Sequence, residues 1–323
     1  MGISSFKTGL MKRSFLAGNV FYDPFSIGRV LFGGGYTIAL GGNVNVVQYV
    51  EIQTTGNATD FGDLTLARRA LTGCSSSTRG LFAGGYTSSY SDVIDYVTIA
   101  TTGNATDFGD LLAAGVRKAG LSNSTRGLFA GKDDTGNKDT IEYVTIASTG
   151  NGTDFGDLTS PRLSSSGAGG CASPTRGVFG GGVYSASNVI DYVTIATTGN
   201  AIDFGDLTVA RGDAATFSNS TRGIFASGFN ASTIQNVIDY ITIASTGNAT
   251  DFGDLSVSRF GSGAGCTSIR GVVGGGEASG GAESNVIDYI TIATLGNATD
   301  FGDLINTCSF LAGFSNAHGG LAA

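Results

Sequence analysis

One run of eleven residues, TTGNATDFGDL at 101–111, organises this sequence because close copies of it occur six times. The glycine near its start recurs at steps of 47 to 49 residues, at Gly56, Gly103, Gly150, Gly199, Gly247 and Gly296. A period in this range is typical of propellers and solenoids, whose units bury their apolar faces only by stacking on neighbours. The sequence therefore predicts a repeat protein with one large body.

Composition favours short strands over helices. Fifty-three glycines against three prolines, many β-branched and aromatic residues, and no sustained helical periodicity predict strands joined by tight turns. The net charge of -8 argues against DNA or RNA as a partner, because nucleic-acid binding depends on clustered Lys and Arg. The longest apolar runs are too short for a transmembrane helix, so no membrane insertion is expected. Neither a secretory signal nor a lipid-attachment motif is recognised at the N-terminus.

Each unit divides into four pieces, which are clearest in the second unit. Residues 78–86 show an alternating pattern that ends in a glycine pair, which predicts a strand followed by a turn. The apolar run from residue 93 predicts a strand covered on both faces. NATDFGDL at 104–111 predicts a turn and an outer strand. The small residues at 71–77 predict an innermost strand, where copies converge around a ring axis. Together these pieces predict an all-β, six-bladed propeller with four-stranded antiparallel blades.

The order of the pieces resembles the kelch repeat, a propeller blade of about 50 residues. The resemblance rests on a glycine pair, an Asp-Tyr strand, an aromatic-Gly-Asp-Leu segment and an Arg five residues after that Asp: Gly84, Gly85, Asp95, Tyr96, Phe108, Asp110, Leu111, Arg68, Arg162, Arg211 and Arg259. Phe stands where the family has tryptophan, and Gly115 and Cys308 replace the Arg in two units. The copies differ little from one another, and in this respect the sequence resembles kelch-like repeat proteins of tailed bacteriophages. This resemblance implies a virion component.

The two ends of the chain differ in their relation to the repeat. Residues 1–27 do not match it, and we expect either an N-terminal arm or an extra strand of the first blade there. The propeller is predicted to span residues 28–323. We expect the last segment to complete the blade that the N-terminal part begins, which would close the ring and remove open sheet edges.

Cysteine and acid positions favour structural roles over metal binding. The thiols of Cys74, Cys171, Cys266 and Cys308 are expected to be free and packed, because a ring places their units too far apart for disulfides. With His318 as the one histidine, neither zinc nor another cofactor is expected. Paired aspartates such as Asp60 and Asp63 either cap backbone N–H groups in turns or bind Ca²⁺, and turn capping is favoured.

Each unit also repeats an Arg in its first strand and an acid or amide before a Tyr, as in Arg79 and Asp95. These residues either form a ring of charges that grips an anionic or sugar ligand, or bond carbonyls and acids at the blade interface. The interface role is favoured, and the same structural role is expected for Tyr96, Phe108 and Asp110. The repeated Asp-Phe-Gly is not a kinase motif, because the chain lacks a phosphate loop and a catalytic loop.

The units differ most in the loops that follow the glycine pairs. Loops on a rigid scaffold commonly carry binding, and Tyr, Ser, Asn and Gly provide an adaptable polar surface. Drift without selection is the alternative. The candidate binding residues in these loops are Tyr36, Tyr86, Tyr90, Lys132, Asp133, Asp134, Tyr184, Phe229, Asn230 and Glu277.

The pattern favours a binding protein over an enzyme. Catalysis needs a residue set apart from its repeats, and the one candidate base, His318, is expected to be structural. The leading hypothesis is a non-enzymatic bacteriophage virion component in the tail, baseplate, fibre or capsid decoration. Its expected partners are other virion proteins, a host-surface glycan or protein, and further copies of itself in a symmetric assembly. The alternative is a free carbohydrate-binding or carbohydrate-cleaving propeller.

Overall fold

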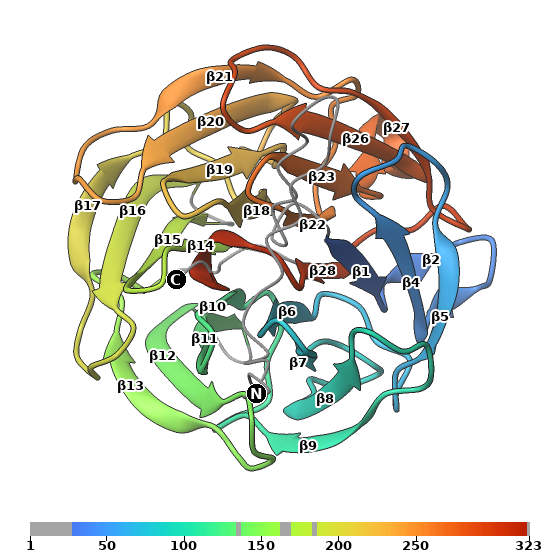
Figure 1. Cartoon of the computed structure of the whole chain (residues 1–323), viewed down its shortest axis with the longest axis horizontal. Coiled ribbons are helices and arrows are strands. Elements are labelled where there is room, and N and C mark those ends of the chain that lie inside the picture. Colours follow the sequence, from blue (N-terminus) through green and yellow to red (C-terminus); the bar gives the residue numbers. More distant parts are fainter. Residues whose placement is uncertain (1–27, 134–136, 162–168, 183–185, 322–323) are drawn as a thin grey trace, which may run out of the picture.

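Strands arranged around a central axis build the molecule, and the only other regular elements in its described part are two short 3-10 turns. A computed structural model describes residues 28–133, 137–161, 169–182 and 186–321, and Figure 1 views it down the axis. Six four-stranded antiparallel sheets surround the axis as the blades of a propeller. The predicted all-β, six-bladed fold is therefore confirmed.

The blades, numbered in chain order, place their strands in four concentric sets. The innermost strands are β28 (Ala312–Ser315), β6 (Thr72–Ser75), β10 (Ala119–Ser122), β14 (Gly170–Ala172), β18 (Ala215–Ser218) and β22 (Gly263–Cys266). The second strands are β1 (Arg29–Gly33), β7 (Arg79–Ala83), β11 (Arg126–Asp133), β15 (Arg176–Gly182), β19 (Arg222–Ala226) and β23 (Arg270–Gly274). The third strands are β4 (Val46–Glu51), β8 (Val93–Thr98), β12 (Asn137–Thr145), β16 (Ser187–Thr194), β20 (Val237–Thr242) and β26 (Val286–Thr291). The outermost strands are β5 (Thr59–Asp63), β9 (Thr106–Asp110), β13 (Thr153–Asp157), β17 (Ile202–Asp206), β21 (Thr250–Asp254) and β27 (Thr299–Asp303).

The C-terminal end completes the first blade, as predicted. β28 pairs with β1 in antiparallel register, which places Val30 opposite Ser315. After β28 the chain forms the 3-10 turn η2 (Gly319–Leu321) instead of another strand. The remaining described elements are the hairpins β2 (Tyr36–Thr37) with β3 (Gly42–Asn43) and β24 (Glu277–Ala278) with β25 (Ala282–Glu283), and the 3-10 turn η1 (Ser279–Gly281).

The TGNATDFGDL runs join neighbouring blades along the rim. In the second copy, the N–H of Gly103 donates to the carbonyl of Phe61 in the outermost strand of the preceding blade at 2.7 Å. The Asn104 side chain accepts a hydrogen bond from the N–H of Asp63 at 3.1 Å. The same contacts recur at all six junctions. Each run therefore supplies both halves of the contact, and its turn covers the edge of a neighbouring strand.

Side chains of the innermost strands lock each blade to the next. At five junctions the residue at one equivalent position of that strand lies against the glycine that follows the repeated Arg, where an added Cβ would overlap it. The pairs are Phe314 on Gly80, Cys74 on Gly127, Leu121 on Gly177, Cys171 on Gly223 and Phe217 on Gly271. At the sixth junction the sizes are exchanged, because Val30 takes the glycine position and faces Gly265. At each junction, a larger side chain on one blade therefore requires a glycine at the facing position of its neighbour.

The innermost strands are less uniformly small than predicted. Leu121, Phe217 and Phe314 are buried there, and they fit because each packs on a glycine of the next blade instead of crowding the axis. Cys266 lies one residue further along its strand than the equivalent cysteines of the second and fourth blades. All four cysteines are free and buried, which confirms the predicted packed thiols.

The repeated Arg of the second strands bonds a carbonyl. Arg79 Nη1 donates to the carbonyl of Ile146 in the next blade at 2.9 Å, and its guanidinium lies 4.5 Å from the centroid of the Tyr96 ring. Equivalent bonds occur in all six blades. Tyr96 packs edge-on against Phe108. Of the two roles considered for this Arg, the interface role is therefore the one observed.

Asp95 takes its cation from another part of the chain. Its carboxylate lies 3.1 Å from Arg68 in the connection that enters the blade, and it accepts a 2.6 Å hydrogen bond from Thr65. Both charged side chains are fully buried. Burial lowers the pKa of Arg68, and the charge of Asp95 opposes that shift. A repeated charge pair between Arg79 and Asp95 is thus not formed. The buried pair, here called the latch, recurs as Arg211 with Asp239 and Arg259 with Asp288.

Two junctions replace the latch in matched ways. Where Gly115 stands in place of the Arg, Lys118 reaches a longer acid, Glu142, at 2.5 Å. Where Cys308 stands in place of the Arg, the position of the acid is taken by Gln48, which is buried and neutral. A buried charge without a partner is costly, so each loss of the Arg accompanies a change that keeps the junction paired or neutral.

Candidate functional site

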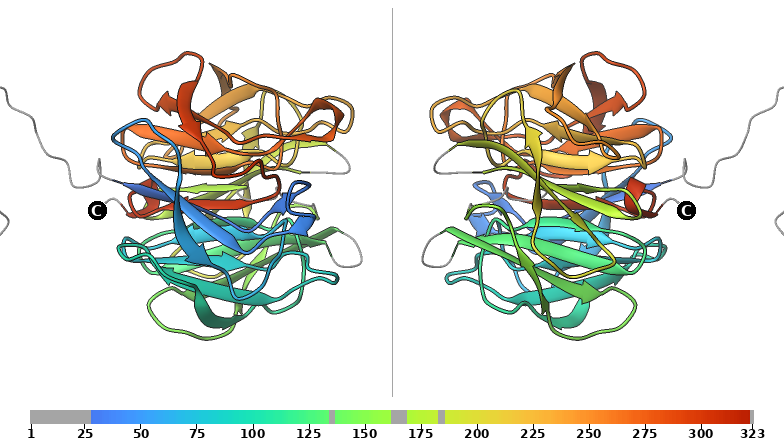
Figure 2. Two further views of the ribbon diagram at one scale, coloured as in Figure 1. Left: turned by 90° about the vertical axis from the view of Figure 1, so that its right-hand side faces the viewer. Right: turned by 90° about the vertical axis from the view of Figure 1, so that its left-hand side faces the viewer.

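The variable loops emerge at one face of the ring, here called the loop face. It carries the described loops 34–45, 84–92, 227–236 and 275–285. The C-terminal end lies on the opposite face, with the β2 and β3 hairpin on the far side from it (Figure 2). Gly28 lies on the same face as that end, because Arg29 N donates to the Asn316 side chain at 2.8 Å. We call this the tether face.

Four predicted binding residues occupy one equivalent position on the loop face. Each follows the glycine pair or its counterpart and forms a β-bridge with the connection that enters its own blade. The bridges are Tyr36 with Ser309, Tyr86 with Arg69, Phe229 with Gly212 and Glu277 with Phe260. The backbone beneath these side chains is therefore fixed by the fold.

Backbone hydrogen bonds link neighbouring blades around the axis at this face. The residues that form them occupy one equivalent site just before each innermost strand, here called the mouth position: Ala70, Arg117, Asp213, Gly261 and Phe310. Four of these N–H groups donate to the carbonyl of the preceding blade's member, as from Arg117 to Ala70 at 2.9 Å and from Phe310 to Gly261 at 2.7 Å. The sixth equivalent, Gly167, lies outside the described residues.

The mouth position has a left-handed backbone, with φ between 52° and 64°. It holds four of the six non-glycine residues with positive φ in the described chain. A left-handed conformation costs a non-glycine residue roughly 1–2 kcal/mol. Gly261 shows that glycine satisfies the fold there, so the arginine, aspartate and phenylalanine are not required by the backbone. Backbone strain of this kind concentrates at functional sites.

Aromatic and arginine side chains link the mouth to the loops. Phe229 packs on Phe260 and Phe260 on Phe310, with ring centroids 5.4 and 5.5 Å apart. The guanidinium of Arg117 lies 5.6 Å from the Phe310 ring. On the neighbouring sector Tyr86 packs against Tyr90, which is 39% exposed. The loop face thus presents aromatic surface next to cations, a composition typical of recognition sites.

Carboxylates lie beside the same aromatic residues, since Glu277 forms the bridge to Phe260. Burial raises the pKa of Glu277, and the nearby charges of Glu283 and Asp213 raise it further, while Arg117 acts in the opposite direction. Glu283 also accepts hydrogen bonds from the N–H of Ile38 at 2.9 and 3.0 Å. Charged groups from different blades therefore converge around the axis.

The other predicted loop residues have different outcomes. Asn230 caps its own loop, because its side-chain oxygen accepts hydrogen bonds from the N–H groups of Ser232 and Thr233. The side chains of four candidates lie outside the described part of the chain: Lys132, Asp133, Asp134 and Tyr184. Sequence reasoning missed the mouth residues and Arg69. Aligning the six connections shows that this position varies, holding Ala, Arg, Asp, Gly and Phe, but the alignment does not show that it lies at the axis.

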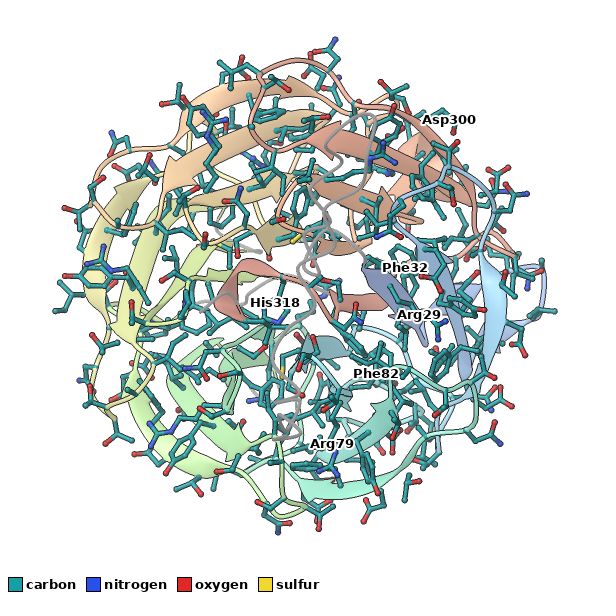
Figure 3. The ribbon with its side chains drawn as sticks, viewed as in Figure 1. Arg29, Phe32, Arg79, Phe82, Asp300 and His318 are labelled. Atoms are coloured by element: carbon teal, nitrogen blue, oxygen red, sulfur yellow. The ribbon has the colours of Figure 1, made fainter. Side chains whose placement is uncertain are left out.

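The opposite end of the axis is a second place where polar groups meet. A cavity of about 50 Å³ there is lined by residues that include Ser75, Ser122 and His318. His318 lies near the axis in Figure 3, with its Nε2 2.9 Å from the carbonyl oxygen of Ser75 and its Nδ1 accepting from the N–H of Gly320 at 3.2 Å. These contacts suit the neutral ring, and they hold η2 against the innermost strands.

Acid is expected to weaken the fold through His318. Burial lowers the pKa of His318 from 6.5 to about 4. Between these pH values the unfolded chain binds a proton that the folded protein does not, so stability falls as pH falls through this window. Because the ring borders the cavity, we expect the contribution to be about 1–2 kcal/mol. Urea unfolding at pH 7 and pH 4 should show a smaller pH effect in His318→Gln, and an equal effect would contradict this assignment.

Metal and thiol chemistry find little support in the described residues. Within them, no group of three or more His, Cys, Asp or Glu residues is placed to hold a metal ion. Burial raises the pKa of Cys266 and of Cys308 to about 12, so these thiols stay protonated and unreactive. No helix in the described ranges has the length and apolarity needed to cross a membrane.

Comparison with known proteins adds no further assignment. No protein-family model matches the sequence, and no curated protein matches it either. The candidate site therefore rests on the geometry of the loop face.

Proposed function

We propose that the protein is a non-enzymatic attachment component of a bacteriophage virion, which binds its target with the loop face. The observation that carries the proposal is the mouth position. The rim contacts of the TGNATDFGDL runs and the arginine–carbonyl bonds recur in all six blades, yet the five described mouth positions hold five different residues with a left-handed backbone. Such asymmetry at the axis of a repeated scaffold serves recognition better than it serves folding.

The positions of the two faces support an attachment role. Residues 1–27 join the propeller at Gly28 on the tether face, opposite the loop face. An assembly that holds the chain through these residues would leave the loop face directed outward. The kelch-like order of the repeat and its resemblance to phage proteins supply the virion part of the proposal.

A second candidate is a free carbohydrate-binding or carbohydrate-cleaving propeller. It is favoured by the carboxylates near the mouth, since burial and the neighbouring acids raise the pKa of Glu277. A carboxylic acid with a raised pKa next to an ionised one is the arrangement that glycosidases use. Turnover of a glycan substrate that is lost in Glu277→Gln would favour this candidate over the virion component.

Deleting residues 1–27 is expected to abolish incorporation into particles and to leave folding intact. The strands of all six blades lie within residues 29–315, so we expect the ring to fold without residues 1–27. Incorporation is measured by immunoblotting purified particles from cells that produce the truncated or full-length chain. The matched control is full-length Arg69→Gln, which should be incorporated normally. If the truncated chain entered particles at full copy number, residues 1–27 would not be the assembly arm. If the full-length chain were absent from particles, the virion proposal would be refuted.

A further inference from the structure

An arginine flanked by two tyrosines on the loop face identifies the ligand that this face would take. The inference rests on the proposed attachment function. The Arg69 guanidinium lies 4.9 Å from the Tyr36 ring centroid and 5.3 Å from that of Tyr86. The backbone of Arg69 is held by the reciprocal bridge to Tyr86, with N···O distances of 3.1 and 2.7 Å. The cation is therefore presented from a rigid base.

The guanidinium of Arg69 differs from the structural arginines in what it bonds. Arg68 is buried against Asp95, and Arg79 donates to a carbonyl of the next blade. Arg69 is half-buried, and among the described residues its guanidinium contacts aromatic rings but forms no hydrogen bond or ion pair. Its donors form a planar fork that matches a carboxylate. Partial exclusion of water by the rings strengthens such a charge-assisted bond.

The surroundings of Arg69 suit a sugar ring. Tyr90 lies 5.8 Å from Tyr86 in an edge-on arrangement and leaves 39% of its surface exposed. An exposed aromatic face packs against the apolar C–H face of a pyranose while its hydroxyl reaches polar groups. Ser88 and Ser89 are exposed in the same loop and provide further hydrogen-bonding groups. The Asn43 side chain fixes this loop by donating to the carbonyls of Tyr86 and Thr87 at 2.9 and 2.8 Å.

The exposed charge on the rim is negative, whereas the loop face carries charges of both signs. Six exposed aspartates surround the rim, one in each outermost strand, and Figure 3 shows Asp300 among them. The protein as a whole carries a net charge of -8. An acidic ligand is repelled from the rim, and on the loop face it would be held by Arg69, the cation that lies between two tyrosine rings.

We propose that Arg69, flanked by Tyr36 and Tyr86, binds the carboxylate of an acidic saccharide whose ring packs against Tyr90. The ligand class is a uronic-acid or sialic-acid sugar at a chain end or within a surface polysaccharide. The planar fork of Arg69 donates to both carboxylate oxygens, and the tyrosines provide the apolar contact.

The test is binding of the full-length protein to an array of glycans that end in glucuronate or N-acetylneuraminate. Each glycan is paired with its carboxyl-reduced counterpart. We expect at least tenfold stronger binding to the acids, a tenfold or greater loss in Arg69→Gln, and an intermediate loss in Arg69→Lys, which keeps the charge without the fork. Thr102→Asp, an exposed change far from the loop face, lowers the net charge by the same amount and should bind normally. Melting temperatures of all variants should match that of the unaltered protein.

The outcomes separate this inference from the proposed function. Equal binding to the carboxyl-reduced glycans, or equal losses in Arg69→Gln and Thr102→Asp, would overturn the carboxylate assignment and leave a loop-face binding module in place. Absence of binding to every glycan would overturn the saccharide assignment. The particle-incorporation experiment then decides the virion proposal independently.

Discussion

Replacing Arg259 with cysteine is expected to lower the free energy of unfolding by about 3–5 kcal/mol, because Asp288 would be left buried without its cation. The two side chains are fully buried and lie 3.1 Å apart. Asp288 would keep its hydrogen bonds from Ser256 at 2.7 and 2.8 Å, but no positive charge would balance it. Urea unfolding followed by tyrosine fluorescence measures the change.

The chain itself offers the matched rescue. Cys308 and Gln48 occupy the same two positions at another junction, where the Gln48 side chain accepts a hydrogen bond from the N–H of Ile305 at 2.7 Å. The double variant Arg259→Cys with Asp288→Gln should therefore recover most of the loss, to within about 1–2 kcal/mol of the unaltered protein. Cys308→Ala is the control for a cysteine without a charged partner and should cost little. A double variant no more stable than Arg259→Cys would contradict the role assigned to the unpaired charge.

Gly80→Val is expected to destabilise the ring by about 3 kcal/mol, because the new side chain would overlap Phe314. Phe314 is buried and packs 4.7 Å from the Phe82 ring, so it has little room to move. The overlap lies at the junction between the first and second blades, next to the strand that closes the ring. Loss of soluble protein and a lower urea midpoint are the expected readouts.

A second substitution tests whether size complementarity explains the effect. Phe314→Gly alone should cost about 4 kcal/mol through the cavity it leaves. Combined with Gly80→Val it copies the natural pair of Val30 and Gly265, so the double variant should lose at least about 2 kcal/mol less than the sum of the single losses. Additive losses would show that the exchanged pair at the sixth junction depends on other features of that junction.

Much of the fold follows from the sequence because each element repeats. The period fixed the number of blades, and the apolar run before Thr98 and the small residues before Ser75 placed strands at the correct depth. The partners of individual side chains did not follow in the same way. Asp95 pairs with Arg68, which precedes it by 27 positions, and periodicity alone does not distinguish that residue from Arg79. Only packing in three dimensions decides between two arginines that repeat at the same interval.

The candidate site was predicted only in part. Loop variability identified Tyr36, Tyr86 and Glu277, which the structure places at equivalent positions around one face. The mouth residues lie in connections that otherwise look like simple links between blades, and their left-handed backbone has no local sequence signal. Arg117 and Phe310 became recognisable when the backbone hydrogen bonds placed them in one ring.

The rim contacts of the TGNATDFGDL runs have a consequence for assembly symmetry. Each blade carries a donor half and an acceptor half on opposite sides, so the contact is heterologous and would extend indefinitely if the rotation per blade did not close the circle. The chain is in effect a covalently fused cyclic hexamer. A fragment of two or three complete blades would keep one free donor half and one free acceptor half, and rings of three or two such fragments would satisfy every contact. The covalent links therefore set the order of the non-identical loops around the axis, while the repeated contact sets the ring.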